Sequence, residues 1–154
     1  MKGKPEIIEK LNFLLADELT AINQYFVHAE ECADWGYELL HHTIEERSIT
    51  EMKHAEKLIA RILFLEGTPV VDKLNKMHIS DSVPGMLEND RQAEEVAIKN
   101  YNEAIKLATE LLDNGTKELL DSILKDEEAH INYIEEQLKQ IEQMELETYL
   151  TTVK

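Results

Sequence analysis

Apolar residues recur every three or four positions along most of the chain, which is the spacing of one face of an α-helix. Four long stretches show this period, and the chain has no alternating pattern typical of β-strands. Glycine and proline mark the stops between the stretches. The pattern predicts helices over about residues 5–34, 37–65, 84–112 and 119–141, with a break at residues 113–115.

The lengths of the connections predict how these helices are arranged. Short turns at Gly36 and Gly115 favour two antiparallel hairpins, whereas residues 66–81 form a 16-residue link. A link of that length can return along a helix of about 45 Å. The sequence therefore predicts an all-α four-helix bundle with one long crossover, as a single domain over residues 1–154. Residues 144–153 favour a short fifth helix, which lacks a partner in a four-helix core and is a candidate assembly element.

Composition and charge narrow the classes of function. The 154 residues carry a formal net charge of −16, so the basic surface of a nucleic-acid-binding protein is missing. We expect no membrane span, because no stretch approaches the ~18 consecutive apolar residues of a membrane helix. The single cysteine, Cys32, excludes an internal disulfide and suits a reducing compartment. We expect a cytoplasmic protein that binds neither nucleic acid nor membrane.

Ionisable residues interrupt the apolar faces in a repeated pattern. Two copies of Glu-x-x-His occur 76 residues apart, and a single glutamate precedes each copy by 33 residues. Residues three apart on a helix share a face, so each copy can direct a carboxylate and an imidazole at one point. The two triplets are Glu18, Glu51 and His54, and then Glu94, Glu127 and His130.

These six residues predict a two-metal centre inside the bundle. Four buried carboxylates would repel one another unless cations compensate their charge, and two divalent ions match them. Oxygen-rich ligation with one imidazole for each metal suits iron or manganese. The alternative is that Glu-x-x-His occurs by chance on acidic helices, but two copies at matched spacing leave little room for chance.

Two tyrosines follow the single glutamates at matched positions. Tyr25 lies seven residues after Glu18, and Tyr101 lies seven residues after Glu94. Both are two turns further along the same face, where their hydroxyls could bond ligand carboxylates or supply an electron during oxidation. The alternative is an ordinary core tyrosine whose hydroxyl finds another partner.

The chain resembles the bacterioferritins of the ferritin-like superfamily over nearly its whole length. The stretches that carry this resemblance are residues 18–26, 34–36, 51–56, 61–67 and 126–130. It implies a shell of about 24 subunits, built from two-fold dimers, that stores iron as a ferric mineral. A ferredoxin or reductase is an expected partner for iron release.

The resemblance also implies a ferroxidase role for the six residues. Glu51 and Glu127 would bridge two iron ions, while Glu18 and Glu94 would each bind one, with His54 and His130 completing the set. The centre would oxidise Fe²⁺ to Fe³⁺ with oxygen or hydrogen peroxide.

Met52 is implied as an axial ligand of a haem b shared at the dimer interface. It follows Glu51 and is rotated by ~100° from the metal-facing direction. We expect it on a second apolar stripe outside the first two helices, and such a stripe implies a partner. Ordinary dimer packing is the alternative for this methionine. The expected stripe consists of Leu19, Ile22, Phe26, Ile49, Met52 and Ile59.

One departure from the family concerns a further iron site on the cavity-facing side of the second helix. Some bacterioferritins carry a histidine and an aspartate there, where this chain has Glu46 and Thr50. Glu46 could bind iron, but a threonine is a poor ligand.

Two other functions remain open for the protein. One is a rubrerythrin-like di-iron peroxidase or oxidase, which the single cysteine disfavours. The other is a haem-binding shell with a degenerate metal centre.

Overall fold

The computed structural model describes all residues 1–154 as an all-helical protein without β-strands. No helix combines the length and the apolar character needed to cross a membrane. The helices are α1 (Pro5–Asp34), α2 (Glu38–Phe64), α3 (Val83–Glu110), α4 (Asn114–Met144) and α5 (Leu146–Thr152).

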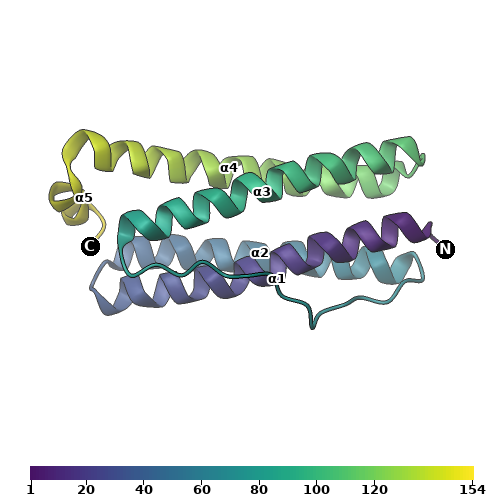
Figure 1. Ribbon diagram of the computed structural model, residues 1–154, viewed down its shortest axis with the longest axis horizontal. Coiled ribbons are helices and arrows are strands. Elements are labelled where there is room, and N and C mark those ends of the chain that lie inside the picture. Colours follow the sequence, from purple (N-terminus) through teal and green to yellow (C-terminus); the bar gives the residue numbers. More distant parts are fainter.

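The four long helices form the predicted bundle with one crossover (Figure 1). Helices α1 and α2 make one antiparallel hairpin, and α3 and α4 make the other. The chain between α2 and α3 returns along α1, so that α3 begins at the end of the bundle where α2 also begins. This placement brings the middle sections of all four helices to the same height, where the repeated carboxylates lie.

The apolar interior forms two clusters rather than one. The first includes Leu11, Leu14, Leu58 and Ile62, and lies toward the N-terminal part of α1. The second includes Ala29, Ile44, Met86 and Ile134, and lies toward the opposite end of the bundle. Between them lie buried carboxylates, so the two clusters exclude water from both sides of a polar layer.

The crossover is held to α1 by a row of polar side chains that the apolar pattern did not predict. Asn12 Oδ1, Thr20 Oγ1 and Gln24 Oε1 accept hydrogen bonds from the backbone N–H groups of residues 70, 75 and 78, at 2.8, 2.8 and 3.0 Å. The Nε2 atom of His28 accepts from the N–H of Ser80 at 3.2 Å. The last three of these side chains recur every four residues along α1, so the row follows one face of the helix.

A buried polar network joins this row to α3. The Nε2 atom of Gln24 donates to Asp90 Oδ1 at 2.8 Å, and Nδ1 of His28 lies 3.0 Å from the same oxygen. Because His28 Nε2 accepts from a backbone N–H, its proton is on Nδ1, which donates to Asp90. The network fixes α3 against α1 one turn before Glu94.

The break between α3 and α4 differs from the prediction at residues 114 and 115, which belong to the first turn of α4. Asp113 caps this helix by accepting from the N–H of Thr116 at 3.1 Å, so the helix begins at the next residue. Gly115 lets the Arg61 guanidinium approach, because a Cβ there would lie 2.7 Å from its Nη2 atom. The glycine therefore serves a close contact rather than a turn.

Helix α5 is present as predicted, but the expectation that it has no partner in the bundle is wrong. Tyr149 is fully buried in the second apolar cluster, and its hydroxyl donates to Gln137 Oε1 at 2.8 Å. The carbonyl of Val153 accepts the N–H of Leu39 at 3.1 Å, which caps the start of α2. The C-terminal segment therefore closes the end of its own bundle.

Candidate metal centre

The structure brings the six predicted residues together between the two apolar clusters. The four glutamates each come from a different long helix, and each is at most 2% exposed. Their ligand atoms form two overlapping groups, and within each group all atoms lie within 4.8 Å of one another. Glu51 and Glu127 belong to both groups, Glu18 and His54 only to the first, and Glu94 and His130 only to the second.

His54 faces three carboxylates through one ring nitrogen. Its Nδ1 atom lies 3.0 Å from Glu51 Oε2, 2.9 Å from Glu127 Oε1 and 3.6 Å from Glu18 Oε1. One nitrogen carries at most one proton, so a single hydrogen bond cannot account for all three approaches. A cation bound by all four groups would account for them.

His130 occupies the matching position in the second group. Its Nδ1 atom lies 3.1 Å from Glu51 Oε1 and 3.5 Å from Glu94 Oε1. The two imidazole rings are nearly parallel, with centroids 6.3 Å apart and planes inclined by 27°. Each ring therefore presents Nδ1 to its own side of the shared glutamates.

Buried polar atoms without hydrogen-bond partners are concentrated in this site. Four of the six such atoms in the protein lie here, namely Glu51 Oε1, Glu94 Oε2, Glu127 Oε1 and His130 Nδ1, and the other two are Glu31 Oε2 and Arg47 Nε. Buried acceptors without donors are costly, and each such atom in a native protein requires an explanation. Coordination of a metal ion supplies that explanation, and the donor set of carboxylates with one imidazole on each side suits iron or manganese.

The electrostatics of the metal-free site show the same need for positive charge. Burial raises the pKa of Glu18 and of Glu127 well above the ordinary value, and neighbouring carboxylates raise it further. Burial alone would lower the pKa of His54, but the nearby carboxylates of Glu127, Glu18 and Glu51 raise it overall. Without metal, protons on these side chains offset the negative charge of the buried carboxylates.

Asp126 is a functional candidate whose role the sequence pattern did not reveal. Its Oδ2 atom lies 2.9 Å from Nε2 of His54, and the side chain of Asp126 is 47% exposed. A carboxylate here accepts the Nε2 proton of the ring, which leaves the Nδ1 lone pair directed at the centre. Asp126 could have been noticed in the sequence, because it immediately precedes the second Glu-x-x-His. The sequence does not show, however, that this carboxylate contacts the ring of His54.

The two tyrosines bond ligand carboxylates, with partners exchanged between helices. The hydroxyl of Tyr25 donates to Glu94 Oε1 at 2.7 Å, and the hydroxyl of Tyr101 donates to Glu18 Oε1. The spacing along each helix predicted that each tyrosine would bond the glutamate of its own helix. Because α1 and α3 pack side by side, each tyrosine instead bonds the glutamate of the other helix. Burial raises the pKa of both phenols well above its usual value, so both remain donors.

A cleft of about 270 Å³ connects the carboxylates with the surface between α1, α3 and the crossover. All four glutamates of the centre line it, and Asp17, Asn75 and His78 line its outer part. The cleft therefore extends from the surface toward the buried carboxylates.

Met52 lies on the outside of the bundle, away from the carboxylates. Its side chain is 48% exposed, and those of Phe26 and Ile49 are exposed to a similar extent. Leu19 and Ile59 are half-buried against the first apolar cluster. The predicted stripe is wrong at Ile22, which is 8% exposed and belongs to the core, because it lies one turn from Glu18 on the inner face of α1.

Comparison with known proteins identifies the family. Residues 8–144 match the family model described as a ferritin-like domain. A bacterioferritin of Brucella melitensis is 42% identical over 149 residues, covering 97% of this chain and 92% of the relative. A bacterioferritin of Rhodobacter capsulatus is 44% identical, covering 90% and 86%. A bacterial ferritin of Synechocystis is 40% identical, covering 97% of each chain. The chain belongs to the ferritin-like family and, within it, to the bacterioferritins.

Proposed function

We propose that this protein stores iron and oxidises Fe²⁺ to Fe³⁺ at the centre formed by Glu18, Glu51, His54, Glu94, Glu127 and His130. Membership in the bacterioferritins supports iron storage. The observation that carries the ferroxidase proposal is the pair of overlapping ligand groups that share Glu51 and Glu127. Two ions held by shared carboxylates lie close enough to deliver two electrons to one oxidant.

The residues of the chain have separate tasks in this proposal. Glu51 and Glu127 would be shared by the two ions, while Glu18 and Glu94 would each hold one, and these two carboxylates accept hydrogen bonds from Tyr101 and Tyr25. The histidines complete the two sets through Nδ1. Iron supplies the redox chemistry, and the raised carboxyl pKa values allow the site to take up and release protons as ions leave and enter.

We assign Fe²⁺ as the substrate, with oxygen or hydrogen peroxide as the oxidant. The cleft beside Asp17 and His78 is the proposed entry route, because its acidic lining attracts cations. The strongly acidic composition supports the same conclusion for the whole surface. Fe³⁺ then accumulates as mineral inside a shell of about 24 subunits built from two-fold dimers, and a ferredoxin or reductase releases it.

We also propose that a haem b lies between two subunits with Met52 of each as an axial ligand. The exposed thioether and its apolar neighbours Phe26 and Ile49 fit a planar apolar group. Bound haem would supply an electron path through the shell. In the variant Met52→Leu, the haem absorption band of the purified protein should disappear while the shell remains assembled. Retention of an unchanged band would exclude this ligand.

The ferroxidase proposal is tested by the double substitution Glu18→Ala and Glu94→Ala. Each change removes a ligand that belongs to only one group, so both ions lose affinity while the shared glutamates remain. Rapid oxidation of Fe²⁺, followed by stopped-flow absorbance, should be abolished. Oxidation at the wild-type rate would contradict the proposal.

Size-exclusion chromatography distinguishes the storage shell from the alternative function, which is a dimeric di-iron peroxidase or oxidase.

A further inference from the structure

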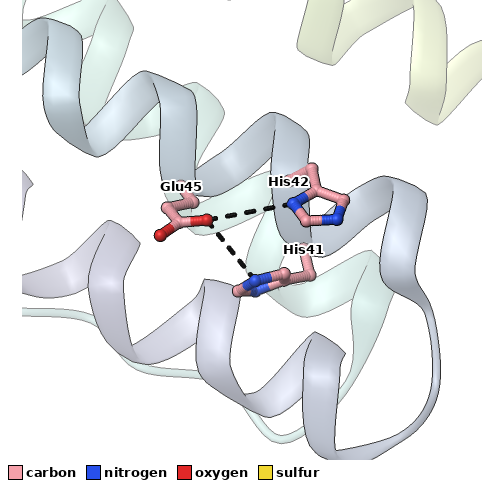
Figure 2. A group of neighbouring side chains, drawn as sticks. All are labelled: His41, His42 and Glu45. Carbon is pink, nitrogen blue, oxygen red and sulfur yellow. Dashed lines mark ion pairs between the residues drawn. The ribbon is translucent and has the colours of Figure 1, made fainter.

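A second group of metal-binding side chains lies in the first two turns of α2, outside the centre described above. It consists of His41, His42 and Glu45, whose ligand atoms all lie within 4.8 Å of one another. Figure 2 shows both imidazole rings directed at the same carboxylate. The group lies about two turns of helix before Glu51, and none of its members contacts the two-metal centre.

The contacts of His41 select the ring nitrogen that is free to bind a metal. Its Nδ1 atom lies 2.9 Å from the backbone carbonyl oxygen of Ala29 on α1. A carbonyl oxygen only accepts, so Nδ1 carries a proton, and in the neutral ring Nε2 then presents the lone pair. That Nε2 atom lies 3.4 Å from Glu45 Oε2. The ring is 14% exposed, so its position is set by the packing of α1 on α2.

His42 approaches the same oxygen through its other type of ring nitrogen. Its Nδ1 atom lies 3.9 Å from Glu45 Oε2, while its Nε2 atom lies 3.8 Å from Glu38 Oε2. At 3.8 Å Glu38 is too far to hydrogen-bond the ring, but its negative charge lies on the Nε2 side, while Nδ1 faces Glu45. Only His41 has a hydrogen-bonded acceptor on the nitrogen that points away from the group, which is the usual arrangement around a metal-bound histidine.

The spacing of the ligand atoms matches one ion rather than two. Ligand atoms bound ~2.0–2.1 Å from one tetrahedral ion lie ~3.4 Å apart. The 3.4 Å distance from His41 to Glu45 already has that value, and the 3.9 Å distance from His42 to Glu45 needs only a small rotation of the exposed His42 side chain. Two imidazoles with one carboxylate form a donor set for first-row divalent ions such as Zn²⁺, Cu²⁺ and Ni²⁺.

We propose that His41, His42 and Glu45 form a mononuclear site for a first-row divalent transition metal. Three protein ligands leave a coordination position for water, so the site exchanges its ion with solvent. The acidic surroundings favour occupation, since Glu38 adds negative charge next to the ligands and the chain is acidic as a whole. The site is independent of the ferroxidase proposal, because it shares no residue with that centre.

Zn²⁺ binding to the assembled protein tests the proposal. Metal-free wild type, His42→Ala, Glu45→Gln and the control Glu56→Gln would be dialysed against the same low free Zn²⁺ concentration, and zinc would be counted per subunit. Both test side chains are partly exposed, so the fold should survive their replacement. Glu56 is an exposed glutamate on the same helix outside the group, so it controls for general loss of negative charge.

The two test variants should bind about one Zn²⁺ fewer per subunit than wild type, and the control should bind the wild-type number. A zinc-edge anomalous map of wild-type crystals should place an ion between the His41 and His42 rings. Equal zinc counts in wild type and both test variants would overturn the site. An equal loss in Glu56→Gln would also overturn it, because the binding would then be non-specific. Oxidation of Fe²⁺ by His42→Ala at the wild-type rate would show that the two-metal centre remains intact.

Discussion

The two Glu-x-x-His halves of the metal centre are related by one shift of 76 residues, yet their histidines are held differently. His54 is 1% exposed, and Asp126 accepts its remote ring proton. His130 is 14% exposed, and its ring makes no such hydrogen bond. The residue that corresponds to Asp126 in the first half is Thr50, whose hydroxyl donates to the carbonyl of Glu46 instead. The repeat places equivalent side chains in the two halves, but only the imidazole of the first half, His54, is oriented by a carboxylate on its remote nitrogen.

This difference implies that the two metal positions are unequal. The His54 position is built from a ring fixed on both nitrogens, so its geometry exists before metal binds. The His130 ring is fixed only by the metal and by packing. We therefore expect tighter binding at the His54 position and easier exchange at the His130 position.

The largest effect is expected when a glutamate that belongs to both ligand groups is removed, compared with a glutamate that belongs to only one. Glu127→Ala removes a carboxylate of both groups, so the variant should lose about two ions per subunit, whereas Glu94→Ala should lose about one. Counting Zn²⁺ per subunit after dialysis at a fixed free concentration distinguishes the variants. Equal losses in the two variants would show that Glu127 does not bridge.

The next effect tests the inequality of the halves directly. Asp126→Ala should weaken metal binding at the His54 position by about 10–100-fold, because the imidazole loses its orienting acceptor. Thr50→Val is the matched control and should change affinity by less than about twofold, since the Thr50 hydroxyl bonds only its own helix. Competitive titration with a chelator measures both. Similar losses in the two variants would remove the proposed asymmetry.

Much of this site could be predicted from the sequence, because its residues recur at regular spacings along the helices. Glutamates within an apolar helical stripe have few explanations, and their identical spacing in the two triplets predicted which six side chains meet in the structure. The crossover was predictable from its length in the same way. These features depend on one helix at a time, or on the length of chain between two helices.

The features that sequence did not predict depend on how neighbouring helices are rotated and packed. The partners of Tyr25 and Tyr101 lie on the opposite helix, and Asp126 meets a ring 72 residues away. The docking of Tyr149 depends on where α4 ends, and the contact of Gly115 with Arg61 joins α4 to α2. Periodicity fixes which face of a helix a residue occupies, but not which atom it meets.

A third prediction concerns pH and the removal of metal. In the metal-free protein the pKa values of Glu18, Glu127, His54 and His130 are raised by folding. Such groups stabilise the fold while protonated, and this contribution is lost as the pH rises through their folded values. Burial alone would raise the pKa of Glu51, but its contacts with Glu18 and the two histidines lower it overall, so its contribution is already complete above about pH 5.

Thermal unfolding can measure this effect. The Tm of the metal-free protein should fall as the pH rises from about 6 to about 9, and bound Zn²⁺ should reduce the fall, because the metal replaces the protons. A metal-free Tm that rises over this range would contradict the account of the site's charge.

The smallest expected effect compares the two tyrosines. Tyr25→Phe and Tyr101→Phe each remove a hydroxyl that donates to a buried ligand carboxylate, so each should cost about 1–3 kcal/mol of stability in the metal-free protein. Because the carboxylates gain a metal partner on loading, the cost should shrink when Zn²⁺ is bound. Chemical denaturation with and without Zn²⁺ measures both values. A cost that is the same in both states would show that the tyrosines act only as core residues.

A crystal structure of the metal-free protein soaked with Fe²⁺ under anaerobic conditions tests the central claim most directly. Anomalous scattering at the iron edge should reveal two ions per subunit in this centre, one beside Nδ1 of His54 and one beside Nδ1 of His130. Glu51 and Glu127 should lie between them. A single ion at this site, or none while other parts of the protein bind iron, would contradict the two-metal account.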